Sequence, residues 1–436
     1  MNSFSVMNAK IFDGRRSIPA RTIRVENGHI AEVGSLGMRE SDPGVIDARG
    51  GTILPGLIDA HVHLLPGSLR QAAAFGVTTL IDQFSKPDLT ASEATFRAQP
   101  GYADFRTSSI GATAPGGHPT MAYSPFPYLE GPSGADQFVA ERVSEGATHI
   151  KVLYEDGSTS PHATPALNLD TIRSLVRAAH EANLIVVAHA TTSKAAIDVV
   201  RCGVDVLAHA PFDEIAPVQL SEIARSGVKV ITTMSIADGF PGANRKLPIL
   251  GHPELARRLG AAWTKVIEQQ SQRWLPDPLP DFSIIAVNVR NLRAVGVSLL
   301  AGTDAPNPGI IHGASMHREP QHLVSAGLTP TAALTAATGS TAEAFNLHDR
   351  GTIAVGQRAD LLLVTGDPTV RITDTQNIRH VWVRGHPVDL HGYVLSDDEA
   401  SSIASLHATT AKIMTAIIKL WPEFPASGTR HTPSTE

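Results

Sequence analysis

The sequence predicts an α/β protein: a (β/α)8 TIM barrel with a small β-sandwich domain built from the N- and C-terminal segments. Between residues 76 and 305, short apolar runs alternate with helical stretches rich in Ala, Leu, Glu and Arg. This alternation is typical of a parallel sheet covered by helices. The two terminal parts of the chain instead show short, closely spaced strand patterns.

Eight apolar runs mark the expected barrel strands, at 53–63, 77–82, 104–112, 149–154, 184–190, 205–210, 228–234 and 297–305. A Gly or Asn that can end a helix in the left-handed conformation precedes five of the runs, in AAAFG, EAN, RCG, RSG and AVG. The structural alternative is an open, doubly wound sheet. That fold would carry a Gly-rich phosphate loop after its first strand, and the sequence has none there.

We expect four segments. Residues 1–55 and 349–390 form the two parts of the sandwich, with a hairpin turn at Asn27 and Gly28. Residues 56–348 form the barrel, and residues 391–436 form a C-terminal helix and a flexible tail. The Pro-rich insertion at 236–282 follows the seventh strand on the side where barrel loops build active sites, so it is the candidate lid or substrate wall.

Composition excludes several classes of protein. The 436 residues carry a formal charge of -6, and the Lys and Arg residues are scattered, so we expect no nucleic-acid partner. The sequence shows neither a leader pattern nor a long uncharged apolar stretch, so we expect a cytoplasmic protein without a membrane partner. Cys202 is the single cysteine and reads as a small core residue. The partners expected are a small-molecule substrate and further copies of the chain in a homo-oligomer.

A set of possible metal ligands follows the expected strands. An HxH pair occurs by chance in a chain with 19 His residues, but His61 and His63 lie at the C-terminal end of the first barrel strand. Residues i and i+2 of a strand point to the same side, and barrel enzymes carry their chemistry at that end. The other candidates occupy equivalent places on strands four, five, six and eight: Lys151, His189, His209 and Asp304. Imidazole and carboxylate suit a borderline cation such as zinc, which can activate water at neutral pH.

Lys151 is the unusual member of this set. An ammonium group beside divalent cations in a barrel mouth is strongly disfavoured. A desolvated, neutral lysine can capture carbon dioxide, and the resulting carbamate is an anion able to bridge two metal ions. The alternative is that Lys151 forms a salt bridge with an acid such as Asp82 or Glu155.

Several motifs together resemble the amidohydrolase superfamily: LPGLIDAHVH, HIKV, VVAHA followed by LAHA, LLAGTDA, and the stretch from AGLTPTAAL to RADLLLV. The resemblance covers nearly the whole chain. The strand-four lysine and the GGH at 116–118 are most similar to the binuclear group of Xaa-Pro dipeptidases, ochratoxinase-like carboxypeptidases and imidazolonepropionase-like proteins. This chain has HATT where many relatives have HAHG, and AHA where they have EHG, so Thr191 and Ala208 replace groups that bear on the substrate.

The resemblance implies two divalent metal ions, each with its own ligands, and zinc is the expected metal. His61, His63 and Asp304 would bind the more buried ion, and His189 and His209 the more exposed one. Carboxylated Lys151 would join the two ions. Asp304 would also be the catalytic residue, taking a proton from the metal-bridging hydroxide and passing it to the leaving nitrogen.

Three further residues are candidates for substrate contact. His118 lies in the loop after strand three, where the resemblance implies a contact with the substrate carbonyl or carboxylate. Tyr154 ends strand four, and a buried aromatic with its hydroxyl at the rim is the equal alternative. His312 follows strand eight on the active-site side, where it would contact either the substrate or the groups behind the metal ligands. His317 and Glu319, which start the next helix, read as surface and capping residues.

The sequence therefore predicts a metal-dependent amidohydrolase that cleaves a C–N amide bond, in an N-acyl amino acid or a small peptide. Two alternatives use a similar site: a lactonase or esterase, and a deaminase of a heterocycle. A bridging lysine argues against the deaminase, because that chemistry typically resembles a one-metal site. A non-catalytic scaffold barrel is a further alternative, but such a protein would be free to lose ligands, and all six are present.

Overall fold

The computed structural model describes residues 3–34, 44–119, 126–155, 165–239, 247–271, 281–390, 400 and 403–408. Eight short parallel strands form two sheets. The first has the order β10-β9-β8, and the second the order β11-β12-β13-β14-β15. The strands are β8 (Leu57–Val62), β9 (Val77–Asp82), β10 (Asp104–Thr107), β11 (His149–Leu153), β12 (Ile185–His189), β13 (Val206–Leu207), β14 (Lys229–Ile231) and β15 (Leu299–Leu300).

Hydrogen bonds join these two sheets at both edges. Beside β8, the amide of His63 donates to the carbonyl of Ala305 at 2.7 Å, and Val62 forms a parallel bridge with Ala305. Beside β11, Ala112 bridges Val152 and donates to the carbonyl of Lys151 at 2.8 Å. The fold is thus α/β with eight parallel strands in one connected arrangement, as the sequence predicted.

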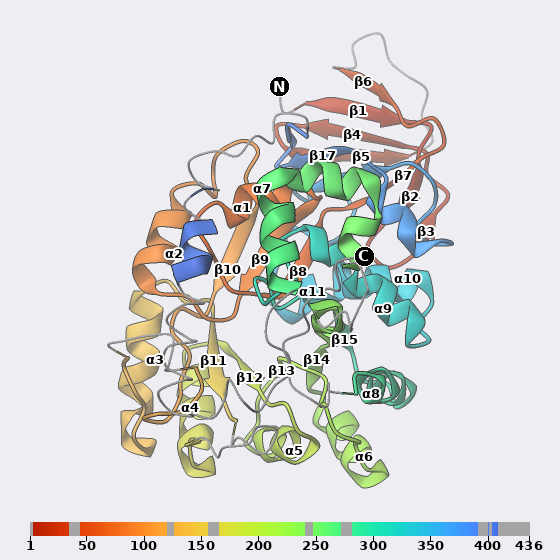
Figure 1. Cartoon of the computed structure of the whole chain (residues 1–436). Helices are drawn as coiled ribbons and strands as arrows, with labels where there is room; N and C mark the ends of the chain where they lie inside the picture. Colours follow the sequence, from red (N-terminus) through yellow and green to blue (C-terminus); the bar gives the residue numbers. More distant parts are fainter. Residues whose placement is uncertain are drawn as a thin grey trace, which may run out of the picture.

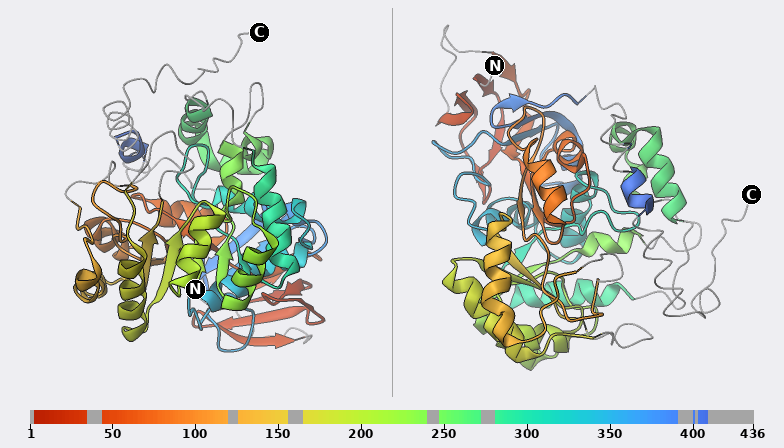
Figure 2. Two further views of the ribbon diagram at one scale, coloured as in Figure 1. Left: turned by 90° about the horizontal axis from the view of Figure 1, so that it is seen from below. Right: turned by 90° about the vertical axis from the view of Figure 1, so that its left-hand side faces the viewer.

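A helix follows each of these strands and packs outside the sheets (Figure 1, and from two further directions in Figure 2). In chain order they are α1 (Ser68–Ala74), α2 (Pro87–Ala94), α3 (Ala135–Ser144), α4 (Leu169–Glu181), α5 (Ser193–Arg201), α6 (Pro217–Ser226), α8 (Ser283–Ala294) and α9 (Glu319–Ser325). The five residues predicted to end helices all have positive φ, namely Gly76, Asn183, Gly203, Gly227 and Gly296. Helix α10 (Pro330–Ala336) and helix α11 (Gly339–Ala344) complete this part.

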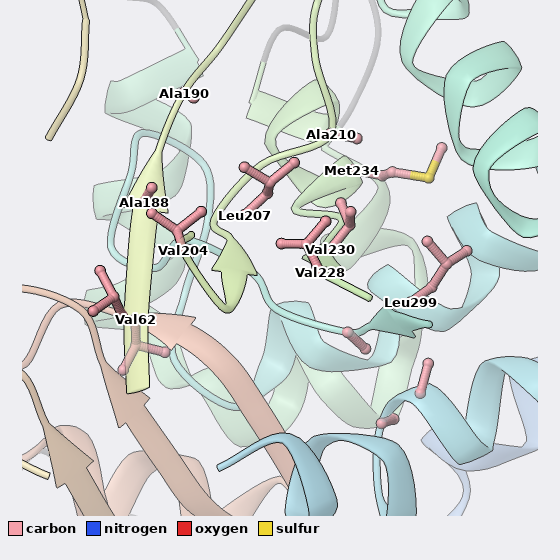
Figure 3. Close-up of a cluster of buried hydrophobic side chains, with 14 of the residues drawn as sticks. Val62, Ala188, Ala190, Val204, Leu207, Ala210, Val228, Val230, Met234 and Leu299 are labelled. Carbon is pink, nitrogen blue, oxygen red and sulfur yellow. The ribbon is translucent and has the colours of Figure 1, made fainter. Parts of the chain in front are cut away.

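Side chains alternate between two apolar cores along the parallel strands. On β15, Leu299 belongs to the large core under the helices, whereas Leu300 belongs to a smaller core with Val187, Val206 and Ile231. Figure 3 shows part of the large core, where side chains from several neighbouring strands meet. Two-residue alternation sends every second side chain to the opposite face. Both faces of the strands are therefore buried.

The terminal segments form two further sheets around one apolar core. One sheet has the order β5-β4-β1-β6, and the other has the order β18-β17-β16-β7-β2-β3. Residues from both chain ends, such as Phe4 and Trp382, stack in the shared core at 4.7 Å between ring centroids. The strands are β1 (Phe4–Met7), β2 (Lys10–Phe12), β3 (Ser17–Ile18), β4 (Thr22–Glu26), β5 (His29–Gly34), β6 (Val45–Asp47), β7 (Thr52–Pro55), β16 (Leu361–Val364), β17 (Ile378–Val383) and β18 (His386–Pro387).

Two local predictions concern this part of the chain. The Asn27–Gly28 turn between β4 and β5 has positive φ at both residues, as the NG pair requires. The expected strand at 53–63 is in fact two strands in different sheets, β7 and β8, separated at Gly56. A Cβ at Gly56 would lie 2.2 Å from Oγ1 of Thr78, so glycine lets the chain cross from one sheet to the other.

The insertion after β14 contains a long helix, α7 (Pro253–Ser271). Leu255, Trp263 and Ile267 of α7 pack with Leu65, which follows β8, and with Leu406 near the end of the chain. Residues 403–408 are helical, and the rest of the expected C-terminal helix lies outside the described residues. The 3-10 turns are η2 (Pro132–Gly134), η3 (Met234–Gly239), η4 (Pro248–Gly251), η5 (Ala314–His317) and η6 (Ile372–Gln376). Within the described residues, no helix has the length and apolar character to cross a membrane.

Candidate metal centre

His61, His63 and Asp304 meet where β8 and the segment after β15 run side by side. Oδ1 of Asp304 lies 3.3 Å from Nε2 of His61 and 3.2 Å from Nε2 of His63. The amide of Asp304 donates to the carbonyl of His61 at 2.7 Å, which locks the two segments together. Asp304 has φ 61, a left-handed conformation uncommon outside glycine. The fold therefore holds this carboxylate in a strained backbone position facing two imidazoles.

His189 and His209 lie on the other side of the same cluster. Nδ1 of His189 is 2.9 Å from Nε2 of His209, and the ring centroids of His61 and His209 are 4.9 Å apart. Donor atoms of His61, His209 and Asp304 all lie within 4.8 Å of one another. The structure thus brings together the four predicted histidines and the predicted aspartate, which come from four separate strand ends.

Three of the imidazoles are oriented by hydrogen bonds on their outer nitrogen. Nδ1 of His61 contacts the carbonyl of Ala208 at 3.2 Å, Nδ1 of His63 the carbonyl of Phe84 at 3.0 Å, and Nδ1 of His209 the hydroxyl of Thr233 at 2.8 Å. A carbonyl oxygen can only accept, so Nδ1 of His61 and His63 carries the proton. Nε2 of these rings is left as an inward-facing lone pair, the form that binds a metal ion.

Lys151 is the fully buried lysine of the cluster, and its Nζ has no hydrogen-bond partner. Burial lowers the pKa of Lys151 to about 7, although the charges of Asp304 and Asp82 oppose this shift. The alternative of a salt bridge to Asp82 is wrong for this structure, because Nζ of Lys151 has no partner; the carboxylate of Asp82 instead accepts from the hydroxyls of Ser85 at 2.6 Å and Thr107 at 2.5 Å. Glu155, the other suggested partner, accepts a hydrogen bond from Thr191. Burial thus favours the neutral form of Lys151.

Three histidines of the site, His61, His209 and His118, are held in their neutral form, whereas the pKa of His63 is raised, because the hydrogen bond and charge of Asp304 outweigh burial. Burial, followed by the charge of Lys151, keeps the pKa of His61 well below its usual value. Burial and the neighbouring His189 do the same for His209, and they lower the pKa of His118 to about 3. Neutral imidazole is the form required of a metal ligand. For His61 and His209 the electrostatics therefore favour cation binding over protonation.

The three candidates for substrate contact have different surroundings. The ring of His118 stacks on that of His189 with 4.9 Å between centroids, so it lies at the cluster as expected. The hydroxyl of Tyr154 donates to Asp198 on α5 at 3.3 Å. His312 is buried and its Nε2 contacts the carbonyl of His63 at 2.9 Å. His312 therefore supports the backbone of a cluster residue.

The prediction for His317 and Glu319 is wrong, because both residues are fully buried. Nε2 of His317 contacts the carbonyl of Phe75 at 2.8 Å. Glu319 accepts hydrogen bonds from the hydroxyl of Thr232 at 2.5 Å and from the amide of Ser235 at 2.6 Å. Its position at a helix start suggested a cap, but its carboxylate instead holds the loop after β14. Sequence position alone does not reveal such a tertiary contact.

Asp59 is a structural residue of the site that the sequence reasoning missed. Its carboxylate is fully buried and accepts hydrogen bonds from the amide of Thr303 at 2.9 Å and from its hydroxyl at 2.6 Å. It also accepts from the amide of His61 at 3.2 Å. An acid inside an otherwise apolar strand was the available signal, because a buried carboxylate requires partners. Asp59 thus ties β8 to the segment that carries Asp304.

Known proteins resemble this chain in sequence and in fold. A profile of the amidohydrolase family matches residues 52–388. Imidazolonepropionase of Phocaeicola vulgatus is 45% identical over 56 residues, which are 12% of this chain and only 14% of that protein. A crystal structure of a Xaa-Pro dipeptidase with bound methionine superimposes with a TM-score of 0.70 at 20% identity, over 88% of this chain and 99% of the other. The crystal structure of A. niger ochratoxinase gives a TM-score of 0.66 at 17% identity, over 88% and 95%.

The chain therefore belongs to the amidohydrolase family. The three groups that the motifs resemble are all represented among these relatives. The structural likenesses, at identities of 20% and 17%, show the shared fold.

Proposed function

We propose that this protein is a metal-dependent amidohydrolase that cleaves a C–N amide bond, in an N-acyl amino acid or a small peptide. The observation that carries the proposal is Lys151: a buried amine with no hydrogen-bond partner, close enough to Asp304 to feel its charge. An isolated buried amine costs stability. A function for it in the site explains why it is there.

The residues present fit a pair of divalent cations, with zinc as the expected metal. The donor set comprises imidazole nitrogens and carboxylate oxygens, and several of these atoms lie within 4.8 Å of one another. Lys151 completes the set as a carbamate: neutral Nζ attacks carbon dioxide, one N–C bond forms, and one proton is released. The anion so formed matches the charge that two cations require.

Two groups of residues would hold these ions. His61, His63 and Asp304 would hold the more buried ion, and His189 and His209 the more exposed one, with the Lys151 carbamate between them. When bound, the ions would supply an activated water and would polarise the substrate carbonyl. The supporting hydrogen bonds of Asp59 and His312 keep the backbone of this site fixed.

Asp304 would move the proton during hydrolysis. Its carboxylate accepts a proton from the attacking water and then gives it to the departing nitrogen, which completes cleavage of the C–N bond. The side chain is only 9% exposed, so few waters compete for this proton. His118, whose ring stacks on that of His189, would donate a hydrogen bond to the substrate.

We also infer that the two parallel sheets close into a single (β/α)8 barrel and that the two terminal sheets pack as a β-sandwich. The hydrogen bonds at both edges of the parallel sheets support the first inference. The apolar core shared by both chain ends supports the second.

The test begins with metal analysis of protein purified without a chelator. Hydrolysis assays follow on N-acyl amino acids, dipeptides, lactones, esters and amino-heterocycles. We expect about two metal ions per chain and turnover of amides. One ion per chain with ammonia released from a heterocycle would indicate a deaminase, and turnover confined to lactones or esters would indicate the other alternative. Protein without metal and without turnover would refute the proposal.

The Lys151→Ala variant tests the carbamate. We expect a loss of activity, partly restored by a small added carboxylic acid that takes the place of the carbamate. Lys10→Ala is the control, because Lys10 lies on the surface in an ion pair with Asp367. Full activity of Lys151→Ala would overturn this part of the proposal.

A further inference from the structure

Each imidazole of the cluster has one nitrogen toward the centre and the other toward a protein group. For His61, His63 and His209 the outer group is neutral: a carbonyl oxygen or a hydroxyl. His189 is different in two respects. Its Nδ1 faces His209, and its outer nitrogen, Nε2, lies 3.7 Å from Oε2 of Glu155. His189 thus has a carboxylate where the other three rings have neutral acceptors.

Glu155 is held firmly in this place. It follows β11 by two residues, and its side chain is 12% exposed. Its Oε2 accepts a hydrogen bond from the hydroxyl of Thr191, which follows His189 by two residues. The amide of Tyr154 donates to the carbonyl of His189 at 3.0 Å, so the backbones that carry Glu155 and His189 are also tied together.

We propose that Glu155, held by Thr191, is a positioning residue that directs Nδ1 of His189 toward the exposed cation and strengthens binding of that cation. The inference rests on the proposed metal-dependent function. It also gives a role to the HATT sequence: the hydroxyl of Thr191 holds the carboxylate in place.

The physical argument concerns the proton on Nε2 of His189. A carboxylate accepts this proton in a charge-assisted hydrogen bond, which fixes the tautomer and makes Nδ1 a stronger base. The two atoms lie 3.7 Å apart, which is longer than a hydrogen bond, so this bond requires them to approach each other. Outer partners of this kind typically contribute a factor of about 10 to 100 in metal affinity.

The test measures cation binding directly. Chelator-treated wild-type protein is titrated with Zn²⁺ alone, in competition with a chromophoric chelator, to give the affinity of each of the two sites. We expect Glu155→Gln, which keeps an acceptor but loses the charge, to weaken only one site, by about 10-fold. Glu155→Ala should weaken the same site by up to about 100-fold, and the other site should be unchanged.

Thr191 provides a second, milder perturbation. Thr191→Val removes the hydroxyl while keeping the shape of the side chain, so it should weaken the same site as Glu155→Gln. Thr191→Ser keeps the hydroxyl, so this variant should bind Zn²⁺ with wild-type affinity at both sites. Glu141→Gln, on an exposed position of α3, is the matched control for loss of one carboxylate.

The outcomes are distinguishable. Wild-type affinity for both ions in Glu155→Ala would overturn the inference. A raised KM with unchanged affinities would also overturn it, because Glu155 would then contact substrate. Failure of the wild-type protein to bind Zn²⁺ at all would instead refute the proposed function itself.

Discussion

Gly302 lies between β15 and Asp304, and the site has no room for a side chain there. A Cβ at Gly302 would be 2.5 Å from Cγ2 of Ile231 and 2.8 Å from the backbone nitrogen of His61. Ordinary contacts begin at 3.4 Å, so the backbone at His61 must move by about 0.6 Å to accept a Gly302→Ala substitution. A displacement of about 1 Å in a catalytic site can cost about 100-fold in rate. We therefore expect Gly302→Ala to lower kcat/KM by roughly 10- to 100-fold.

The assay compares hydrolysis, bound metal and thermal unfolding for this variant. Overpacking of this kind also destabilises a protein by about 1–3 kcal/mol, so Tm should fall modestly. Gly131→Ala is the control, because an added Cβ there meets nothing within 4 Å and φ is -177, an extended conformation open to any residue. If Gly302→Ala kept wild-type activity and metal content, the close packing of β15 against His61 would not be important for the site.

Two further predictions concern residues around the site and beneath it. Replacing His312 by Phe removes the contact with the carbonyl of His63 while keeping a ring, so kcat should fall roughly tenfold with KM unchanged. A rise in KM alone would show that His312 touches substrate instead. Asp104→Asn should lower stability by about 3–5 kcal/mol, because Asp104 is buried against Arg350 at 2.7 Å and Arg358 at 3.1 Å. Burial raises the pKa of Asp104, but nearby arginines, above all the charge of Arg350, outweigh burial and lower it. The Asp104 carboxylate therefore contributes its full stabilisation above its pKa in the unfolded chain, about 4. This contribution is lost as pH falls through its lower pKa in the folded protein. Thermal unfolding of both proteins between pH 7 and pH 3 checks this, and a gap in Tm that widened on acidification would contradict it.

Much of the fold could be predicted because it depends on local chemistry. Apolar runs with helices between them gave the eight parallel strands, and the residues that end the helices with positive φ were identified as Gly or Asn. The Asn27–Gly28 turn was predictable for the same reason, since only a few residues adopt that conformation without strain.

The grouping of His61, His63, His189, His209 and Asp304 was also predictable, because neighbouring parallel strands end at one edge. Once the strand order is known, residues at those ends must lie near one another. The expected first barrel strand, 53–63, ran past Pro55 and Gly56, although both are poor strand formers and the expected segment boundary falls between residues 55 and 56. The tertiary structure adds that Thr78 of the neighbouring strand leaves no room for a side chain at residue 56.

Burial and partner choice were decided by tertiary structure. Glu319 has the sequence position of a helix cap, yet its carboxylate holds the loop after β14 from a distance of more than 80 residues along the chain. Lys151 had two suggested carboxylate partners, and the fold gives both of those carboxylates to hydroxyl groups. The hydrogen bond between Thr191 and Glu155 likewise joins the ends of two strands. Local sequence sets backbone conformation and the pattern of apolar residues, whereas the partner of a buried polar group depends on which distant segment packs against it.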